Sequence, residues 1–138
     1  MGYKSPDIVA ISGGHTLWDP ADSTTYYFGL MMGSTPSTGK IHNIVMPIKG
    51  NITKVAFYTL IGTVGTTEAS VVTLRKNDTT DYTIKSFDYS TTPQTDVITN
   101  LHIPVSAGDI IIFKEVSPAW VTNPLQIRKI FCLILETD

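Results

Sequence analysis

Residues 70–89 read SVVTLRKNDTTDYTIKSFDY and predict a β-hairpin. Both flanks, 70–76 and 82–89, are rich in Val, Thr, Ile and Tyr, residue types that suit a pleated strand. The segment between them, 77–81, carries Asn and Asp, whose side chains bond to nearby backbone and tolerate the left-handed conformation of a tight turn. We therefore expect antiparallel strands to be the basic unit of the fold.

Working outward from this hairpin, the rest of the chain repeats the same pattern. In 52–62 the alternation places Val55, Phe57 and Thr59 on one face of a strand. No window shows the apolar spacing of a long helix, so the sequence predicts an all-β sandwich of about eight to ten antiparallel strands with under about a tenth of the residues in helix. The further strand candidates, each bounded by Gly, Pro, Asn, Asp or Thr, are 9–12, 24–30, 42–48, 52–62, 97–105, 109–116 and 129–136.

Length and charge limit the range of functions. The chain has 138 residues, a usual size for one domain, and a net charge of -2. It has no run of Lys and Arg for a nucleic-acid backbone and no apolar stretch of the ~20 residues that cross a bilayer, so we expect neither partner. Charged residues make up 16% of the chain, whereas about a quarter is typical of soluble domains. This shortage suggests that part of the surface does not face water.

Several segments resemble a known family. Residues 70–78 (SVVTLRKND) and 101–114 (LHIPVSAGDIIIFK) resemble the jelly roll of the C1q/tumour-necrosis-factor superfamily, with Lys76-Asn77 and Gly108-Asp109 at its two turns. The aromatic run 25–28 is similar to an early strand of that superfamily. More closely, residues 50–53, 74–81 and 118–124 look like a domain of phage structural proteins.

The resemblance implies a fold, an assembly and a location. It implies a jelly-roll domain over residues 24–138, preceded by an N-terminal arm with a first short strand over 1–23, in a single-domain chain. It further implies a homotrimer in the virion, as a capsid decoration, a head fibre or a tail-fibre tip. The expected partners are other copies of the chain, other virion proteins and a host-cell surface glycan. A receptor- or carbohydrate-binding module is the alternative.

Aromatic side chains are the candidate anchors of such an assembly or of the core. Tyr and Trp are enriched where subunits meet, because one end of the ring is apolar and the other can bond. Trp120 lies in a stiff loop between Pro118 and Pro124, and we expect it to be buried at the end of the sandwich or against a neighbour. The candidate anchors are Tyr26, Tyr27, Phe28, Tyr58, Trp120 and Phe131.

Catalytic and metal-binding patterns are not evident in the sequence. No Gly-x-Ser-x-Gly motif is present and the three histidines do not share a local ligand spacing, so we expect no enzyme and no cofactor. The single cysteine, Cys132, excludes an internal disulfide and is expected to be a small buried hydrophobe. Asp78 and Asp81 flank a turn and are metal candidates, for calcium, although the spacing of known calcium loops is missing.

Overall fold

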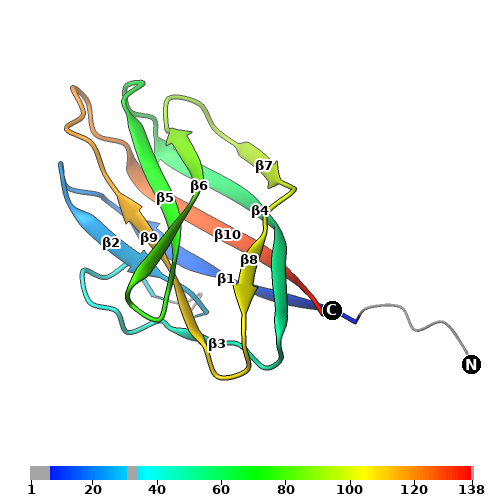
Figure 1. The fold of residues 1–138 in the computed structure, drawn as a ribbon. Coiled ribbons are helices and arrows are strands. Elements are labelled where there is room, and N and C mark those ends of the chain that lie inside the picture. The colour runs from blue at the N-terminus through cyan, green and yellow to red at the C-terminus, as the bar shows by residue number, and fades with distance from the viewer. Residues whose placement is uncertain (1–6, 31–33, 138) are drawn as a thin grey trace, which may run out of the picture.

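The fold is a sandwich of two antiparallel β-sheets, seen in a computed structural model that describes residues 7–30 and 34–137 (Figure 1). Each sheet contains five strands, and no helix occurs among the described residues. The predicted all-β sandwich is thereby confirmed. In these described parts of the chain, no helix is present that could cross a membrane.

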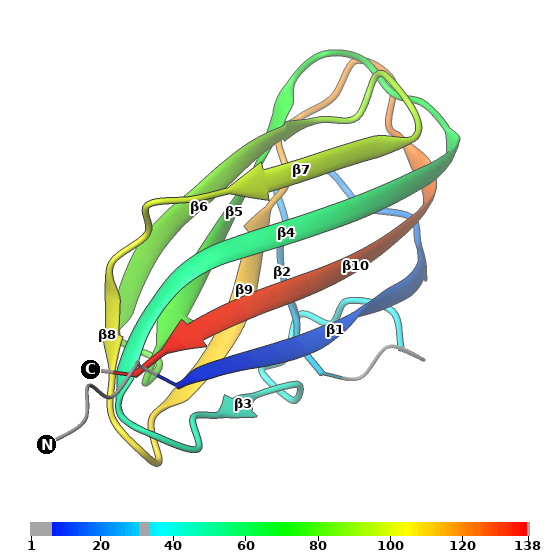
Figure 2. The same ribbon diagram turned by 90° about the vertical axis from the view of Figure 1, so that its right-hand side faces the viewer.

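Sheet A is the sheet that faces the viewer in Figure 2. Its strands follow the order β1-β10-β4-β7, and β8 pairs with the start of β4. The long strands β10 and β4 share an antiparallel register over most of their length and form the middle of the sheet. The bounds are β1 Ile8–Trp18, β10 Leu125–Glu136, β4 Gly50–Thr63, β7 Gln94–Ile98 and β8 Ile103–Val105.

Sheet B packs against the inner face of sheet A. Its strands follow the order β2-β9-β5-β6, and the short β3 pairs with the start of β9. The hairpin that opened the sequence analysis is β5 and β6, paired from Lys76 and Thr80 outward. The bounds are β2 Thr25–Phe28, β9 Ile110–Val116, β5 Ala69–Lys76, β6 Thr80–Asp88 and β3 Ile44–Val45.

The pairing is nested around this hairpin. Moving outward along the chain from β5 and β6, β4 pairs with β7 and β8, then β2 and β3 pair with β9, and β1 pairs with β10. Successive pairs alternate between the two sheets. A chain folded as one long nested hairpin and wrapped into two sheets is the jelly-roll arrangement, which leaves the first and last strands side by side.

The core lies between the sheets and is largely aromatic. Phe28 and Phe113 of sheet B stack at 5.2 Å between ring centroids, and Phe131 of sheet A packs on Phe113 at 4.6 Å. Phe57 meets Phe87 edge to face. Because inward residues alternate with outward ones, Val55, Phe57 and Thr59 of β4, which the sequence placed on one face of a strand, are all buried.

Some strand limits differ from the sequence prediction. The first strand runs over Ile8–Trp18 and pairs with β10, so 8–18 belong to the sandwich, whereas only 9–12 was expected to be strand within an arm. The Gly13-Gly14 pair permits this, because a Cβ at either position would collide with neighbouring backbone. The expected strand 97–105 is divided into β7 and β8, and 42–48 shortens to β3. Residues 1–6 of the expected arm lie outside the described residues.

The turns use the residues that their backbone demands. Asn77 and Asp78 have φ of 50° and 57°, the left-handed region that Asn and Asp tolerate. Gly108, with φ of 89°, makes the turn before β9, and Asp109 caps it by accepting a hydrogen bond from the Ser106 amide at 2.8 Å. Asn77 also donates to Asp109 and accepts from the Ile110 amide, so it ties the hairpin to β9.

Candidate functional site

The outer face of sheet A carries a group of apolar side chains that no other element of the described chain covers. Tyr58 and Ile130 on the two central strands are 42% and 47% exposed, and Val97 on the edge strand β7 is 66% exposed, values that are high for large apolar side chains. With Ser12, Ala56, Leu60 and Cys132 they form what we call the sheet A patch.

Strand register brings the members of the patch together. Ile130 of β10 is directly opposite Tyr58 of β4, and Cys132 is opposite Ala56, whose partner on β7 is Val97. Figure 2 looks onto these strands and β1, which run side by side across the sheet in the order β1-β10-β4-β7. Directly opposite side chains in an antiparallel pair lie within contact distance, so the patch is one continuous surface.

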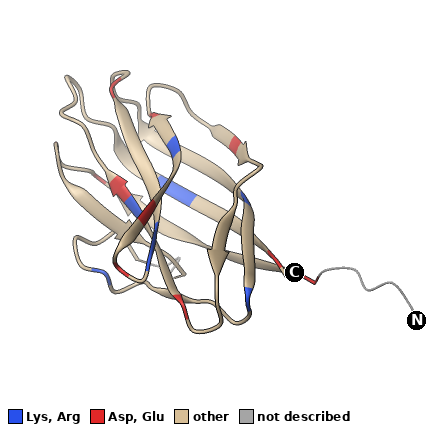
Figure 3. Cartoon of the chain, in the orientation of Figure 1, with Lys and Arg blue, Asp and Glu red and all other residues tan. Residues whose placement is uncertain are grey.

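The patch has a shape and a charge pattern suited to contact. Two shallow hollows of about 320 and 240 Å³ lie on it, one beside Leu60 and Arg128 and the other around Ala56 and Val97. The patch itself contains no charged residue, and the charged side chains Lys54 and Arg128 flank it on β4 and β10. Figure 3 shows how few charged positions the strands carry.

The predicted aromatic anchors divide between the core and the surface. Phe28 and Phe131 are fully buried in the core of the chain itself, and Tyr27 is buried at the edge of sheet B. Tyr26 is half-buried and packs edge to face on Trp18 at 4.9 Å. Tyr58 is the one member of this set whose ring lies on the sheet A patch. The aromatic count in the sequence could not separate these two roles.

Trp120 closes one end of the sandwich. It is 5% exposed and belongs to the main hydrophobic core. Its indole N–H donates to the Glu68 carbonyl oxygen at 3.0 Å, and the Glu68 carboxylate accepts from the Val121 amide at 2.8 Å. The loop between Pro118 and Pro124 is therefore fixed to the β4–β5 connection, and the ring is buried within its own subunit.

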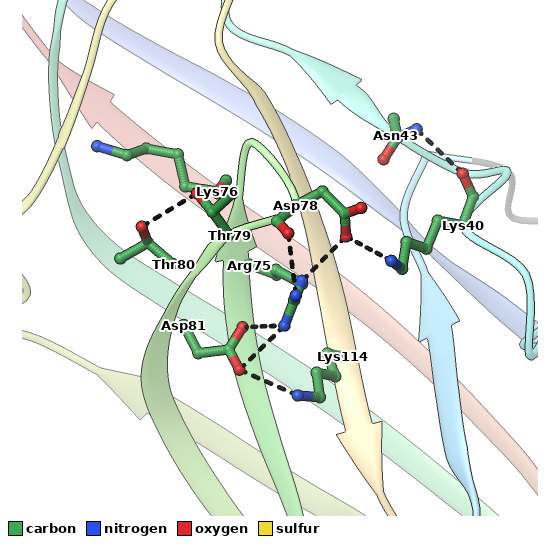
Figure 4. A network of polar contacts seen from close by, with 9 residues as sticks. All are labelled: Lys40, Asn43, Arg75, Lys76, Asp78, Thr79, Thr80, Asp81 and Lys114. Carbon is green, nitrogen blue, oxygen red and sulfur yellow. Dashed lines mark hydrogen bonds and ion pairs between the residues drawn. The ribbon is translucent and has the colours of Figure 1, made fainter.

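Asp78 and Asp81, the metal candidates, are both engaged with cations (Figure 4). Asp78 pairs with Lys40 and Arg75, and Asp81 pairs with Arg75 and Lys114. These partners hold the pKa of the Asp78 carboxyl below its usual range. The described residues contain no group of three or more His, Cys, Asp or Glu side chains placed to hold a metal ion.

A hollow of about 440 Å³ lies beside this ion-pair network. Polar side chains from Lys40, Asn43 and Arg75 line one part of it, and Ile110 and Ile112 of β9 line another. The Arg75 guanidinium, one of the groups that line it, is held in place by hydrogen bonds to Asp78 and Asp81. The hollow could accommodate a small polar molecule with an apolar side.

The histidines and the cysteine do not form a site. His15 is buried against Trp18 and Phe28, and desolvation lowers its pKa to about 4. His42 is buried and His102 is exposed, so the two do not share an environment. Cys132, expected to be buried, is half-buried on the outer face, because Phe131 and Leu133 take the inward positions of the alternation.

A fully buried polar cluster escaped the sequence prediction. Lys129 of β10 and Glu115 of β9 have no exposed surface, and Lys129 Nζ lies 3.2 Å from Glu115 Oε1. The hydroxyls of Tyr89 and Ser70 donate to Glu115 Oε2 at 2.5 and 2.6 Å. A signal was available, since alternation places Lys129 on the same face as Ile127, Phe131 and Leu133.

Comparisons with known proteins identify no family. No protein-family model and no curated protein matches the chain. Among solved structures, one titled as the crystal structure of FlhE is similar, with 14% sequence identity, a TM-score of 0.46, and coverage of 97% of this chain and 98% of that chain.

Proposed function

We propose that the protein is a non-enzymatic structural component of a virus particle, a capsid decoration, a head fibre or a tail-fibre tip, and that it assembles as a homotrimer through the sheet A patch. The observation that carries the assembly is the exposed, uncharged row formed by Tyr58, Val97 and Ile130. The location on a particle rests on the resemblance of the sequence to phage structural proteins.

The patch has the character of an interface core. Contiguous apolar surface is rare on soluble monomers and commonly marks a contact with another macromolecule. Interface cores are depleted in charge and enriched in aromatic residues, with a polar rim. The patch matches this description, because Tyr58 lies near its centre and Lys54 and Arg128 lie at its border.

The architecture favours binding over chemistry. The patch lies on β4 and β10, the two long central strands, whose extensive pairing makes a rigid platform. A rigid surface loses little conformational entropy on association, which favours tight contact. The hollow of about 440 Å³ on sheet B lies beside ion-paired side chains, an arrangement suited to recognition.

Light scattering on the purified chain tests the assembly. Wild type should have the mass of a trimer at micromolar concentration. Ile130→Asp should be monomeric, because it places a carboxylate inside the contact. Val121→Asp is the matched control, since Val121 is 86% exposed in the loop beyond β9, away from the patch. A monomeric wild type, or a trimer unaffected by Ile130→Asp, would contradict the assembly.

Electron microscopy of particles from the native source tests the location. Antibody against the folded chain should label the particle surface, and the protein should copurify with particles through a density gradient. Free protein with none on the particles would remove the virion proposal and leave the assembly proposal to be judged on light scattering alone.

A second candidate function has a separate observation behind it. The hollow beside Lys40, Asn43 and Arg75 combines hydrogen-bonding side chains with the apolar Ile110 and Ile112, as sugar sites do. Titration of the chain with oligosaccharides tests a receptor- or carbohydrate-binding role. Binding lost in Arg75→Gln and kept in Lys54→Gln, a change on the opposite sheet, would support it.

A further inference from the structure

The polar cluster in the core has a geometry that goes beyond an ordinary ion pair. Lys129 comes from sheet A and Glu115 from sheet B, and both are completely buried. Four aromatic rings surround the amine, with Nζ 3.5 Å from the Phe87 ring centroid and 5.0 to 5.9 Å from those of Tyr89, Phe57 and Phe28. Such a site excludes water from both groups.

A dry site changes the balance between the charged and neutral forms of the pair. Burial lowers the pKa of the Lys129 ammonium, and the nearby Glu115 carboxylate only partly opposes this. Transfer of one proton from the ammonium to the carboxylate makes a carboxylic acid and a neutral amine, the form that burial favours for Lys129. The neutral amine is a nucleophile and the protonated carboxyl is its electrophile.

Tyr89 lies where a proton relay is required. Lys129 Nζ donates to the Tyr89 oxygen at 2.6 Å, and the Tyr89 hydroxyl donates to Glu115 Oε2 at 2.5 Å. The two bonds form a continuous path from the amine to one carboxyl oxygen. Ser70 donates to the same oxygen, whereas in the described parts of the chain Oε1 is hydrogen-bonded to Nζ alone. The two carboxyl oxygens therefore have different surroundings, one suited to leave and one to remain.

We propose that Lys129 and Glu115 condense to an intramolecular amide that covalently joins the two sheets. Nζ attacks Cδ of Glu115, and a C–N bond forms. The Cδ–Oε2 bond then breaks, and Oε2 leaves as water with two protons, one from the carboxylic acid and one passed from the amine through Tyr89. Oε1 becomes the amide oxygen. No oxidant, metal or cofactor is needed, because the step is a dehydration.

Two features drive the reaction forward. The fold holds both groups in place, so the step is intramolecular and has a high effective concentration. The product replaces two buried ionisable groups with one neutral amide, which ends the cost of keeping charge in the core. The amide would close the segment 115–129 and fix β9 to β10 across the sandwich. This covalent tie does not depend on the proposed function.

Mass spectrometry under denaturing conditions tests the inference directly. The folded, aged wild-type chain should be lighter than its sequence by one water molecule. Trypsin should release 115–128 and 129–138 as one branched peptide, since an amidated Lys129 is no longer cut. Fragmentation must place the link at Glu115 and Lys129, because a cyclised aspartate also loses water. A full-mass chain, or a loss mapped elsewhere, overturns the proposal.

Variants separate the roles of the residues. Lys129→Arg should keep the full mass, because a guanidinium is a poor nucleophile. Lys85→Arg, the matched control, should still lose water, since Lys85 pairs with Asp96 at the sandwich edge at 3.3 Å. Tyr89→Phe should slow the appearance of the branched peptide at least tenfold after refolding. An unchanged rate in Tyr89→Phe would contradict proton transfer through Tyr89. A water loss that persists in Lys129→Arg would contradict the amide between Lys129 and Glu115.

Discussion

Among single residues, Lys129 has a large expected effect on stability. Compared with freshly refolded wild type, in which the amide has not yet formed, Lys129→Met removes the amine and leaves Glu115 buried with only hydroxyl partners. Breaking a buried pair in this way costs about 3–5 kcal/mol of unfolding free energy. Urea denaturation of Lys129→Met should show this loss, and the double variant with Glu115→Gln should recover most of it, because a neutral amide keeps the contacts with Ser70 and Tyr89. Equal stability of the two variants would contradict the argument.

His15 gives the fold a pH dependence of known sign. Its pKa is 6.5 in the unfolded chain and about 4 in the folded one, where burial disfavours the imidazolium. Between these values the unfolded chain binds a proton that the folded chain does not. Stability should therefore fall as pH is lowered from about 6.5 to about 4, by about 3 kcal/mol in total, and change no further through this group below that range.

Denaturation of wild type and His15→Asn across pH 4 to 7 measures this effect. The asparagine amide can still donate to the Thr16 carbonyl, as Nδ1 of His15 does at 2.9 Å, but it does not titrate. The variant should lose this part of the pH dependence while the contribution of the carboxylates remains. If the unfolding free energy of both proteins changed with pH in the same way, His15 would not be the cause of the pH dependence.

At the scale of elements, Asn77 couples the central hairpin to β9. Its side chain makes two hydrogen bonds to the turn before β9, and its own backbone is left-handed. Asn77→Ala should cost about 2–3 kcal/mol, since it removes both bonds and adds strain. Asn77→Gly should cost less, because glycine accepts the backbone angle. Thermal unfolding of the two variants separates the bonds from the strain, and equal losses would assign the whole effect to the bonds.

The sequence predicts an element well when the residues that determine it are close together in the chain. Alternation and turn residues around 77–81 are local, and they predicted β5 and β6 closely. The first strand was expected only over 9–12, yet pairing with β10 carries it through Gly13 and Gly14 to Trp18. A single sequence does not show which distant strands pair, and this pairing determines where such a strand ends.

The same limit applies to the candidate site. Alternation along β4 correctly placed Tyr58 and Phe57 on opposite faces, so the members of the patch on this strand share a face that could be read from the sequence. Whether Tyr58 meets Ile130 depends on register between strands far apart in the chain. The Lys129 cluster needed both kinds of information, since its members come from β5, β9, β10 and the residue after β6.

For the whole molecule, burial of Trp120 and exposure of the sheet A patch predict different responses to mutation. Trp120 is 5% exposed within its own subunit, so Trp120→Ala should cost about 3–5 kcal/mol whether or not subunits associate. Trp120→Phe, which keeps most of the packing but loses the bond to Glu68, should cost less. Chemical denaturation should give the same loss of unfolding free energy at two protein concentrations, because the contacts of Trp120 lie within one subunit.

Association should also show in how the melting temperature depends on protein concentration. A trimer is stabilised by mass action, so the Tm of wild type should rise with concentration, whereas a monomer melts at a fixed temperature. Trp120→Ala should lower the Tm at every protein concentration but leave its rise with concentration unchanged, because the core contacts of Trp120 are internal. Ile130→Asp should make the Tm independent of concentration. The Ile130 side chain is 47% exposed on the patch and contributes little to the fold of one subunit. The sheet A patch would not be where the subunits meet if the Tm of wild type did not depend on concentration, or if Trp120→Ala alone removed that dependence.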